Sequence, residues 1–484
     1  MNSKIRIIKS IYHKSKTYCY LKEIKSIIIT SLFYKILFNN SAVDIFFENS
    51  FLRKIFNFKK NKSKQKTELK FDNFFLTRFF AFLVVFFVAL IKTKFITLLI
   101  LITIIIFFLE IIFKDKKLEL KFNLIDISIV FFLVNLLLSS IFVFKIKQSL
   151  KVFFIYLVFI AFYFVLKNVL RTKKDLLNIL RFLVASGFIV SIIGISQKFF
   201  NLVISPGAWI DEKVFSENTT RIFSTLDNPN VLGEFLIFVI PLNITLIYLS
   251  KKIKEKILLL LVLFSLLLCM LLTLSRGAWL GLILSLLIFF LFCDKKIFLL
   301  ILCFLFASPI FIPKSFVDRF VSILSAKDSS SHYRINIWLS CLIMLKDFWL
   351  CGIGLGFDNF IFIFKKYAMS ASYALHSHNL YLEIFLEMGF SGIILFLLIL
   401  FFCLKKLVST DKFSSDKSLF FLKIALLSGI IGFMIQGLAD NSFYSYKLIC
   451  IFFVILALSN IRNEMLKLSI WKKFRLLQRE YNLK

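Results

Sequence analysis

Two of the four histidines of this chain lie close together in the stretch HSHNLYLEIFLEMGFSG, residues 376–392. His376 and His378 precede a long apolar run, which places them at the end of a hydrophobic segment. A neutral imidazole, with an ordinary pKa of about 6.5, can accept a proton from a hydroxyl group at neutral pH. Asn379 follows His378 and can contact the same alcohol or, together with His378, cap a helix. The stretch therefore predicts a base beside a binding site for an alcohol.

Three arginines and one aspartate complete the candidate set: Arg221, Arg276 in the stretch TLSRGAWL, Arg334, and Asp440. A guanidinium group binds phosphate or pyrophosphate through two parallel hydrogen bonds, and this contact strengthens where water is partly excluded. Anion binders beside a base suit the transfer of a group from a lipid-phosphate carrier to an alcohol. Arginine charge can stabilise the departing pyrophosphate, so neither a metal nor a cofactor is expected. A metal site made of His376, His378 and Glu383 is disfavoured, because the loops lack the aspartate cluster of a divalent phosphate site.

The composition identifies the kind of structure that must position these residues. The 484-residue chain is 59% hydrophobic and contains 65 phenylalanines, which is too apolar for a soluble globule. Repeated apolar runs of about 17–25 residues are long enough to cross a bilayer as helices, and they lack the period-two alternation of a barrel. The sequence therefore predicts an all-α, polytopic membrane helical bundle. The twelve expected spans are 74–91, 95–113, 122–144, 150–169, 176–197, 231–250, 257–274, 277–293, 297–313, 379–404, 419–440 and 446–461.

The distribution of lysine and arginine predicts the orientation of these spans. If residues 1–73 are cytoplasmic and the segments alternate, basic stretches such as KDKKLELK, KNVLRTKKD and the C-terminus all lie inside. Both termini are then cytoplasmic, the net charge of +33 reflects topology, and nucleic acid is excluded as a partner. Three parts are expected: a basic N-terminal region (1–73) with an interfacial helix at 26–38, a transmembrane catalytic domain (74–461), and a basic tail (462–484).

This orientation places every candidate residue on the outer side of the membrane. Two long outer segments, 198–230 and 314–378, carry several of them, and the second forms a large loop between spans nine and ten. Helices that bundle can bring these residues around one cavity open to the outer leaflet. Each residue alone also has a structural explanation: Arg221 and Arg334 as solvated loop charges, Arg276 as a headgroup anchor, His376 as a structural residue, and Asp440 as an ion-pair partner or helix cap.

The large outer loop contains a predicted helix at SSSHYRINIWLSCLIMLKDF, residues 329–348. Its apolar residues recur at helical spacing, which predicts an amphipathic helix lying along the outer membrane surface. The stretch GIGLGF (352–357) is interpreted as a turn, because no strand precedes it as a dinucleotide fingerprint requires. Cys341 and Cys351 share this loop, so a disulfide between them is left open.

At these residues the chain resembles the O-antigen ligase and polymerase superfamily. One signature is an arginine followed by three residues and a leucine, here RGAWL (276–280). The other is a histidine followed by Asn, Ser or Gln, nine residues, a glycine, two residues and a small residue. HNLYLEIFLEMGFSG (378–392) fits it, with Gly389 and Gly392 in place. The resemblance extends over about residues 180–445 and includes RIFSTLDNPNVLGEFL (221–236) and the stretch 330–360.

The resemblance implies a metal-independent, inverting glycosyltransferase of the membrane-embedded, GT-C-like class. Such an enzyme takes a glycan from undecaprenyl pyrophosphate at the outer face of the bacterial cytoplasmic (inner) membrane and passes it to a hydroxyl of a glycan, lipid or protein acceptor. By motif, His378 is the base or contacts the acceptor hydroxyl, and Arg276 and Arg221 hold the pyrophosphate. Arg334 and Asp440 join this set from their placement, and His376 orients His378 or serves the acceptor.

Two alternatives stay open at the level of the sequence. A polymerase shares the chemistry of a ligase but extends a glycan on its own carrier, and the histidine signature favours the ligase. Some relatives have been labelled as inorganic-carbon transporters, and a transporter is expected to place charged residues at mid-membrane. The charges within the predicted spans, Arg78, Arg181 and Lys423, form no obvious site, so a small-anion transporter is the weaker hypothesis.

Overall fold

The structure is a computed structural model, and it describes residues 74–113, 122–200, 221–311, 329–369, 374–408, 416–441 and 443–460. All of them belong to one unit of the chain, Asp72–Lys484. The predicted interfacial helix at 26–38 and the tail at 462–484 lie outside the described residues, as do residues 201–220 of the first predicted outer segment.

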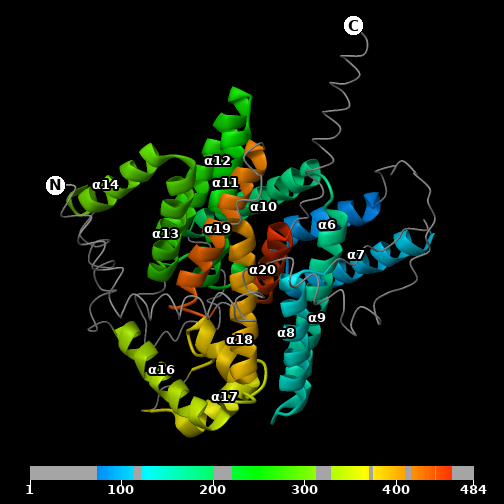
Figure 1. Cartoon of the computed structure of the whole chain (residues 1–484). Helices are drawn as coiled ribbons and strands as arrows, with labels where there is room; N and C mark the ends of the chain where they lie inside the picture. Colours follow the sequence, from blue (N-terminus) through cyan, green and yellow to red (C-terminus); the bar gives the residue numbers. More distant parts are fainter. Residues whose placement is uncertain are drawn as a thin grey trace, which may run out of the picture. The chain divides into compact units, whose positions relative to one another are not determined.

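The described residues form helices and connecting segments without a strand, which confirms the predicted all-α membrane bundle (Figure 1). In the first half these helices are α6 (Phe75–Phe87), α7 (Thr93–Phe113), α8 (Leu124–Ile141), α9 (Ile146–Val169), α10 (Lys173–Phe199), α11 (Pro229–Leu249), α12 (Ile253–Leu272), α13 (Arg276–Cys293) and α14 (Lys295–Phe311), with a short 3-10 turn, η2 (Ser224–Leu226). The second half contains α16 (Ser329–Phe348), α17 (Phe357–Tyr367), α18 (Leu380–Val408), α19 (Lys417–Gln436) and α20 (Tyr446–Ser459).

Each of the twelve predicted spans corresponds to a helix. Among the described residues, nine helices are long and apolar enough to cross a membrane, which makes this a multi-pass membrane protein. Of the twelve described helices at predicted spans, three are shorter than the other nine: α6 with 13 residues, α14 with 17 and α20 with 14.

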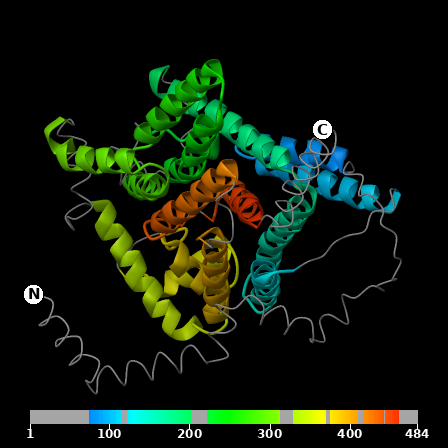
Figure 2. The ribbon, with the colours of Figure 1, turned by 45° about the horizontal axis from the view of Figure 1, so that its top comes forward.

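Helix α11 lies at the centre of the bundle and is more completely buried than any other span-length helix. It packs against α10, α12, α13 and α19. Small residues allow these helices to approach closely: a Cβ added to Gly281 of α13 would lie 2.7 Å from the carbonyl oxygen of Gly432 in α19. In two views, α18, α19 and α20 lie between the green helices α11–α13 and the cyan α8 and α9 (Figures 1 and 2). The first residues of α11, α13 and α18 are thereby held close to the end of α19.

A glycine break divides α18 behind these first residues. Gly389 has φ 70° and ψ −169°, and it separates residues 380–388 from 390–408. The backbone around the break bonds to the end of α16 and to the GIGLGF turn: Phe390 N donates to Trp349 O (2.7 Å), and Ile353 N donates to Leu386 O (2.7 Å). A Cβ on Gly389 would lie 2.2 Å from the carbonyl oxygen of Leu350, so only glycine fits this contact. The turn therefore fixes the direction of the helical segment that follows the two histidines.

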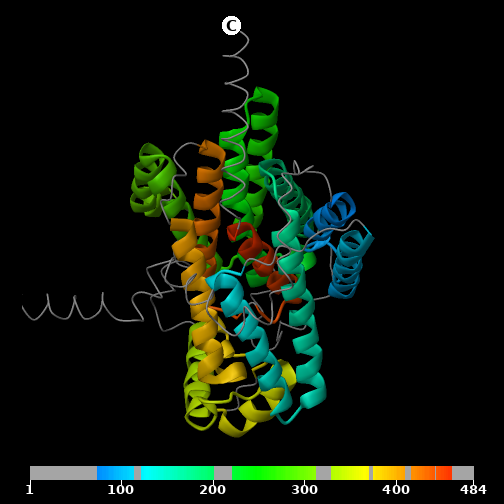
Figure 3. The same ribbon diagram turned by 45° about the vertical axis from the view of Figure 1, so that its right-hand side comes forward.

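Helix α16 confirms the helix predicted at residues 329–348 and packs beside α17 and α18 (Figure 3). Ile337, Cys341 and Met344 are buried on its inner face. Its outer face is also apolar, with Ile335 and Leu339 among its exposed residues, so it is less amphipathic than predicted. Cys341 is buried and Cys351 exposed, and both are free thiols, so the disulfide left open from the sequence does not form.

Candidate functional site

The two predicted histidines lie in the segment that leads into α18, and local hydrogen bonds hold this segment in place. The buried carboxylate of Glu383 accepts a hydrogen bond from Ser377 N (2.6 Å). Asn379 caps the helix, because its Oδ1 accepts from the backbone N–H groups of Tyr381 and Leu382 (3.0 Å each). Its Nδ2 donates to the carbonyl oxygen of Leu438 (3.0 Å), which joins the segment to the end of α19.

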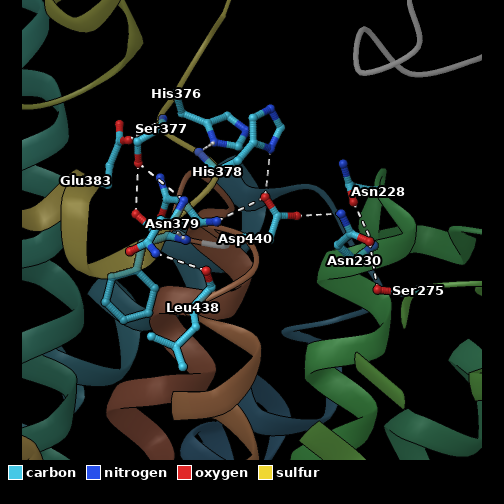
Figure 4. Close-up of polar contacts among 12 residues, drawn as sticks. Asn228, Asn230, Ser275, His376, Ser377, His378, Asn379, Glu383, Leu438 and Asp440 are labelled. Atoms are coloured by element: carbon cyan, nitrogen blue, oxygen red, sulfur yellow. Dashed lines mark hydrogen bonds and ion pairs between the residues drawn. The ribbon is translucent and has the colours of Figure 1, made fainter. Parts of the chain in front are cut away.

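His378 is paired with Asp440, which follows α19 (Figure 4). Nδ1 of His378 lies 3.0 Å from Oδ1 of Asp440, and the side chains are 24% and 3% exposed. His378 has a positive φ of 50°, a conformation that is uncommon for a residue with a side chain. The backbone therefore turns this imidazole toward a buried carboxylate while part of the ring stays accessible.

Asp440 is held on both of its carboxylate oxygens. Oδ1 also accepts from Asn441 N (3.0 Å), and Oδ2 accepts from Asn230 Nδ2 (2.5 Å). Burial opposes its ionisation, but the hydrogen bond from His378 and the charges of His378, Arg334 and His376 outweigh burial and lower the pKa of Asp440. An ionised carboxylate only accepts hydrogen bonds, so we assign the proton of neutral His378 to Nδ1 and a lone pair to Nε2.

His376 has a different environment from His378. It is buried, its Nδ1 accepts a hydrogen bond from His378 N (3.2 Å), and its ring centroid lies 4.8 Å from that of Tyr444. Burial, followed by the positive charge of His378, lowers the pKa of His376 well below the ordinary value despite the opposing effect of Asp440. His376 therefore stays neutral near pH 7 and supports the backbone of His378.

Arg221 joins this group through Asn230. Its Nη2 donates to Asn230 Oδ1 (2.9 Å), and its Nε donates to the carbonyl oxygen of Thr273 (2.9 Å). Ser275, which precedes α13, donates its hydroxyl to the same Asn230 Oδ1 (2.8 Å) rather than capping its own helix. An unbroken chain of hydrogen bonds thus runs from Arg221 through Asn230 and Asp440 to His378.

Arg276 and Arg334 complete the predicted set. Arg276 is the first residue of α13 and is partly exposed. The next residue, Gly277, approaches Gln436 and Ala439 so closely that an added Cβ would lie 2.2 Å from Gln436 Oε1. Arg334 of α16 is partly exposed, and its charge contributes to lowering the pKa values of Asp440 and His376. All seven residues predicted from the sequence therefore lie at one end of the bundle.

Three residues of the site were not predicted as part of it: Asn230, Ser275 and Tyr444. Asn230 belongs to the stretch NPN (228–230), whose composition is typical of a turn, and Asn228 caps α11 by accepting from Asn230 N (2.7 Å). Ser275 immediately precedes the arginine signature RGAWL, and this position is the feature of the sequence that could have indicated its part in the site. No spacing in the sequence indicates that Tyr444 stacks on His376.

The same residues include a possible metal-ligand group. His376, His378 and Asp440 each offer one ligand atom, and these atoms lie within 4.8 Å of one another. Two imidazoles and a carboxylate suit a zinc-like ion better than magnesium. Glu383, considered with the histidines from the sequence, instead accepts a hydrogen bond from Ser377 N.

The fold and the site together define a multi-pass membrane protein with a histidine–carboxylate pair beside arginines. Residues 260–397 match the family model described as O-antigen ligase. This match confirms the resemblance to the O-antigen ligase superfamily, over a shorter stretch than expected. The matched stretch contains Arg276, Arg334, His376 and His378, whereas Arg221 and Asp440 lie outside it. No curated protein matches the chain. The family supports a membrane glycan transferase of ligase or polymerase type.

Proposed function

We propose that the protein is a metal-independent glycan ligase of the bacterial cytoplasmic membrane, with both termini in the cytoplasm. It moves a glycan from undecaprenyl pyrophosphate to a hydroxyl group of a glycan, lipid or protein acceptor on the extracytoplasmic face. The observation that carries the proposal is the pair His378–Asp440, with Nδ1 and Oδ1 3.0 Å apart. Arg276 at the start of α13 and Arg221 in the segment before η2 lie at the same end of the bundle.

In the proposed reaction, Nε2 of His378 takes the proton of the acceptor hydroxyl. The oxygen attacks the anomeric carbon of the donor from the face opposite the pyrophosphate, so the configuration inverts. The bond from that carbon to the pyrophosphate oxygen breaks, and both electrons leave with the lipid pyrophosphate. Asp440 stabilises the imidazolium that forms, as a carboxylate does in a catalytic triad.

The leaving pyrophosphate carries the negative charge that the arginines are proposed to bind. Arg276 and Arg334 are partly exposed, and Arg221 keeps two of its donor atoms on Thr273 and Asn230. In this assignment Arg276 and Arg334 contact the pyrophosphate directly, whereas Arg221, which is also partly exposed, contributes its charge while it holds Asn230. The N-terminus of α13, where Ser275 makes no side-chain cap, lies in the same region, and the positive end of its helix dipole further favours an anion.

His376 and Asn379 are assigned to the acceptor side as supports. His376 orients His378 by accepting a hydrogen bond from its backbone N–H. Asn379 caps α18 and so fixes the segment that presents His378 to the acceptor. The pKa of Asp440 is already lowered, so no metal is required to keep its carboxylate ionised.

The test is transfer by the purified protein in liposomes that contain an undecaprenyl-pyrophosphate glycan. His378→Ala should abolish transfer while the variant inserts and melts as the wild type does. Equal turnover by the two proteins would remove His378 as the base. Offering a separate hydroxyl-bearing acceptor and a second donor in parallel separates the two family activities. A ligase transfers one block to the acceptor, whereas a polymerase lengthens the glycan on its carrier.

A further inference from the structure

Asn230 occupies the point where the two sides of the site meet (Figure 4). Its Oδ1 accepts from Arg221 Nη2 (2.9 Å) and Ser275 Oγ (2.8 Å), and its Nδ2 donates to Asp440 Oδ2 (2.5 Å). Arg221 lies on the side proposed to bind pyrophosphate, and Asp440 lies on the side that holds the proposed base. One amide thus connects the segment that begins α11 with two segments distant in the sequence, those of Ser275 and Asp440.

The orientation of this amide follows from its partners. A guanidinium group is only a donor and an ionised carboxylate is only an acceptor. Turning the amide by 180° would place its NH₂ against Arg221 and its oxygen against Asp440, so both contacts would become repulsive. The amide of Asn230 can therefore occupy only one orientation while Arg221 and Asp440 keep their charges.

We propose that Asn230 is a positioning residue that couples the pyrophosphate side of the site to the proton-accepting side. This role rests on the function proposed above. By holding Oδ2 of Asp440, Asn230 directs Oδ1 toward Nδ1 of His378 and stops the carboxylate from rotating. Because the same amide holds Arg221, a displacement of that guanidinium changes the position of His378 through three hydrogen bonds, by way of the Asn230 amide and the Asp440 carboxylate.

Asn230→Asp provides a sensitive test, since it keeps the shape and the acceptor for Arg221 but replaces the donor that faces Asp440. Two carboxylates in contact share a proton at low pH and repel each other once both are ionised. The deficit of the variant relative to the wild type should therefore be smallest at acid pH and grow as the pH rises. Other groups whose charges bear on this region come from each neighbouring element: His376, His378, Arg334, Glu234, Tyr444 and Arg221.

The matched control is Asn228→Asp, which adds the same charge two residues away. Asn228 caps α11, and aspartate caps as well as asparagine does.

We expect Asn230→Asp to lower kcat/KM for transfer about ten- to hundredfold at pH 8, as loss of a hydrogen bond to a charged group does. The deficit should shrink toward pH 6. Asn228→Asp should keep the pH profile of the wild type. Parallel profiles for Asn230→Asp and the wild type would overturn the proposed role.

A second measurement does not depend on turnover. The chain contains four histidines, so ¹⁵N-histidine labelling of the full-length protein gives few imidazole signals. In the wild type His378 should show the tautomer protonated at Nδ1, and Asn230→Ala should reduce that population even where the variant is inactive. An unchanged tautomer in a folded Asn230→Ala protein would also overturn the role. If His378→Ala transfers glycan at the wild-type rate, the proposed function is wrong. If His378→Ala is inactive but the Asn230 variants keep the wild-type pH profile and His378 tautomer, only the proposed role of Asn230 is wrong.

Discussion

Nδ1 of His378 lies 3.0 Å from Oδ1 of Asp440, although the two residues are separated by 62 positions and by two membrane helices. Asp440 is almost completely buried, and its second oxygen is held by Asn230. The pair therefore has a fixed geometry, in which His378 keeps its proton on the side of the carboxylate and its lone pair on the other.

Asp440→Asn tests this pairing. An amide at this position has no charge to stabilise the imidazolium and does not enforce the tautomer with a free Nε2. We expect kcat to fall by about 10²–10⁴-fold with little change in the melting temperature. The measurement is steady-state transfer in liposomes. A loss below threefold would show that Asp440 acts only as a structural residue.

Arg276→Lys tests the contact with pyrophosphate. An ammonium keeps the charge but cannot form two parallel hydrogen bonds to a phosphate, so kcat/KM for the lipid-linked donor should fall about ten- to hundredfold. Arg181→Lys is the matched control, because Arg181 lies in α10 and bonds Asn178 within the same helix. Normal kinetics of the Arg276 variant would leave Arg276 as an anchor to lipid headgroups.

His376→Asn tests the pKa shift caused by burial. In the unfolded chain this imidazole binds a proton below about pH 6.5, whereas the lowered pKa keeps it neutral in the folded protein. The unfolded state then binds more protons, so the wild type should lose stability as the pH falls below 6.5, by up to about 1.4 kcal/mol per pH unit. Asparagine can accept from His378 N without titrating, so this variant should lose less of its melting temperature between pH 7 and pH 5. Identical slopes would show that His376 does not titrate differently in the two states.

The histidine–aspartate group also predicts the effect of metals. EDTA should leave transfer unchanged, because the proposed reaction uses arginine charge to stabilise the pyrophosphate. Added Zn²⁺ should inhibit reversibly, since His376, His378 and Asp440 offer three ligand atoms within 4.8 Å and binding would occupy the base. His376→Asn should weaken this inhibition. Loss of activity in EDTA that Mg²⁺ restores would contradict metal independence.

Gly389→Ala tests the break in α18. Its φ of 70° disfavours alanine, and the new Cβ would lie 2.2 Å from Leu350 O. We expect a cost of about 2 kcal/mol or more and a large loss of transfer, because the segment after His378 would be redirected. Gly429→Ala is the control. Gly429 lies inside α19, and a Cβ added to it would lie 3.2 Å from its nearest neighbour, Phe238 Cδ1. Equal melting temperatures for the two variants would show that the break tolerates a side chain.

The apolar runs of the sequence were sufficient to predict the helices, since a segment that crosses a bilayer must satisfy its own backbone hydrogen bonds and be apolar along its length. All twelve predicted spans correspond to helices, but the sequence overestimated the length of α6, whose end it could not separate from the apolar turn that follows Phe87. The sequence also predicted a helix with one apolar face at 329–348, whereas α16 is apolar on two faces. Its inner face packs on α17 and α18, and its outer face exposes Ile335 and Leu339.

For the candidate site, too, the sequence predicted some features and the packing of the helices decided the others. Residue type and predicted topology alone selected His376, His378, Asp440 and the arginines, because polar groups are costly inside a membrane and their side of it follows from charge. Only the tertiary structure decided which histidine meets Asp440, that Arg221 is held through Asn230, and that Ser275 turns to the same amide. These contacts join residues from different helices through hydrogen bonds a few ångströms long, and such distances depend on how the helices pack rather than on spacing along the chain.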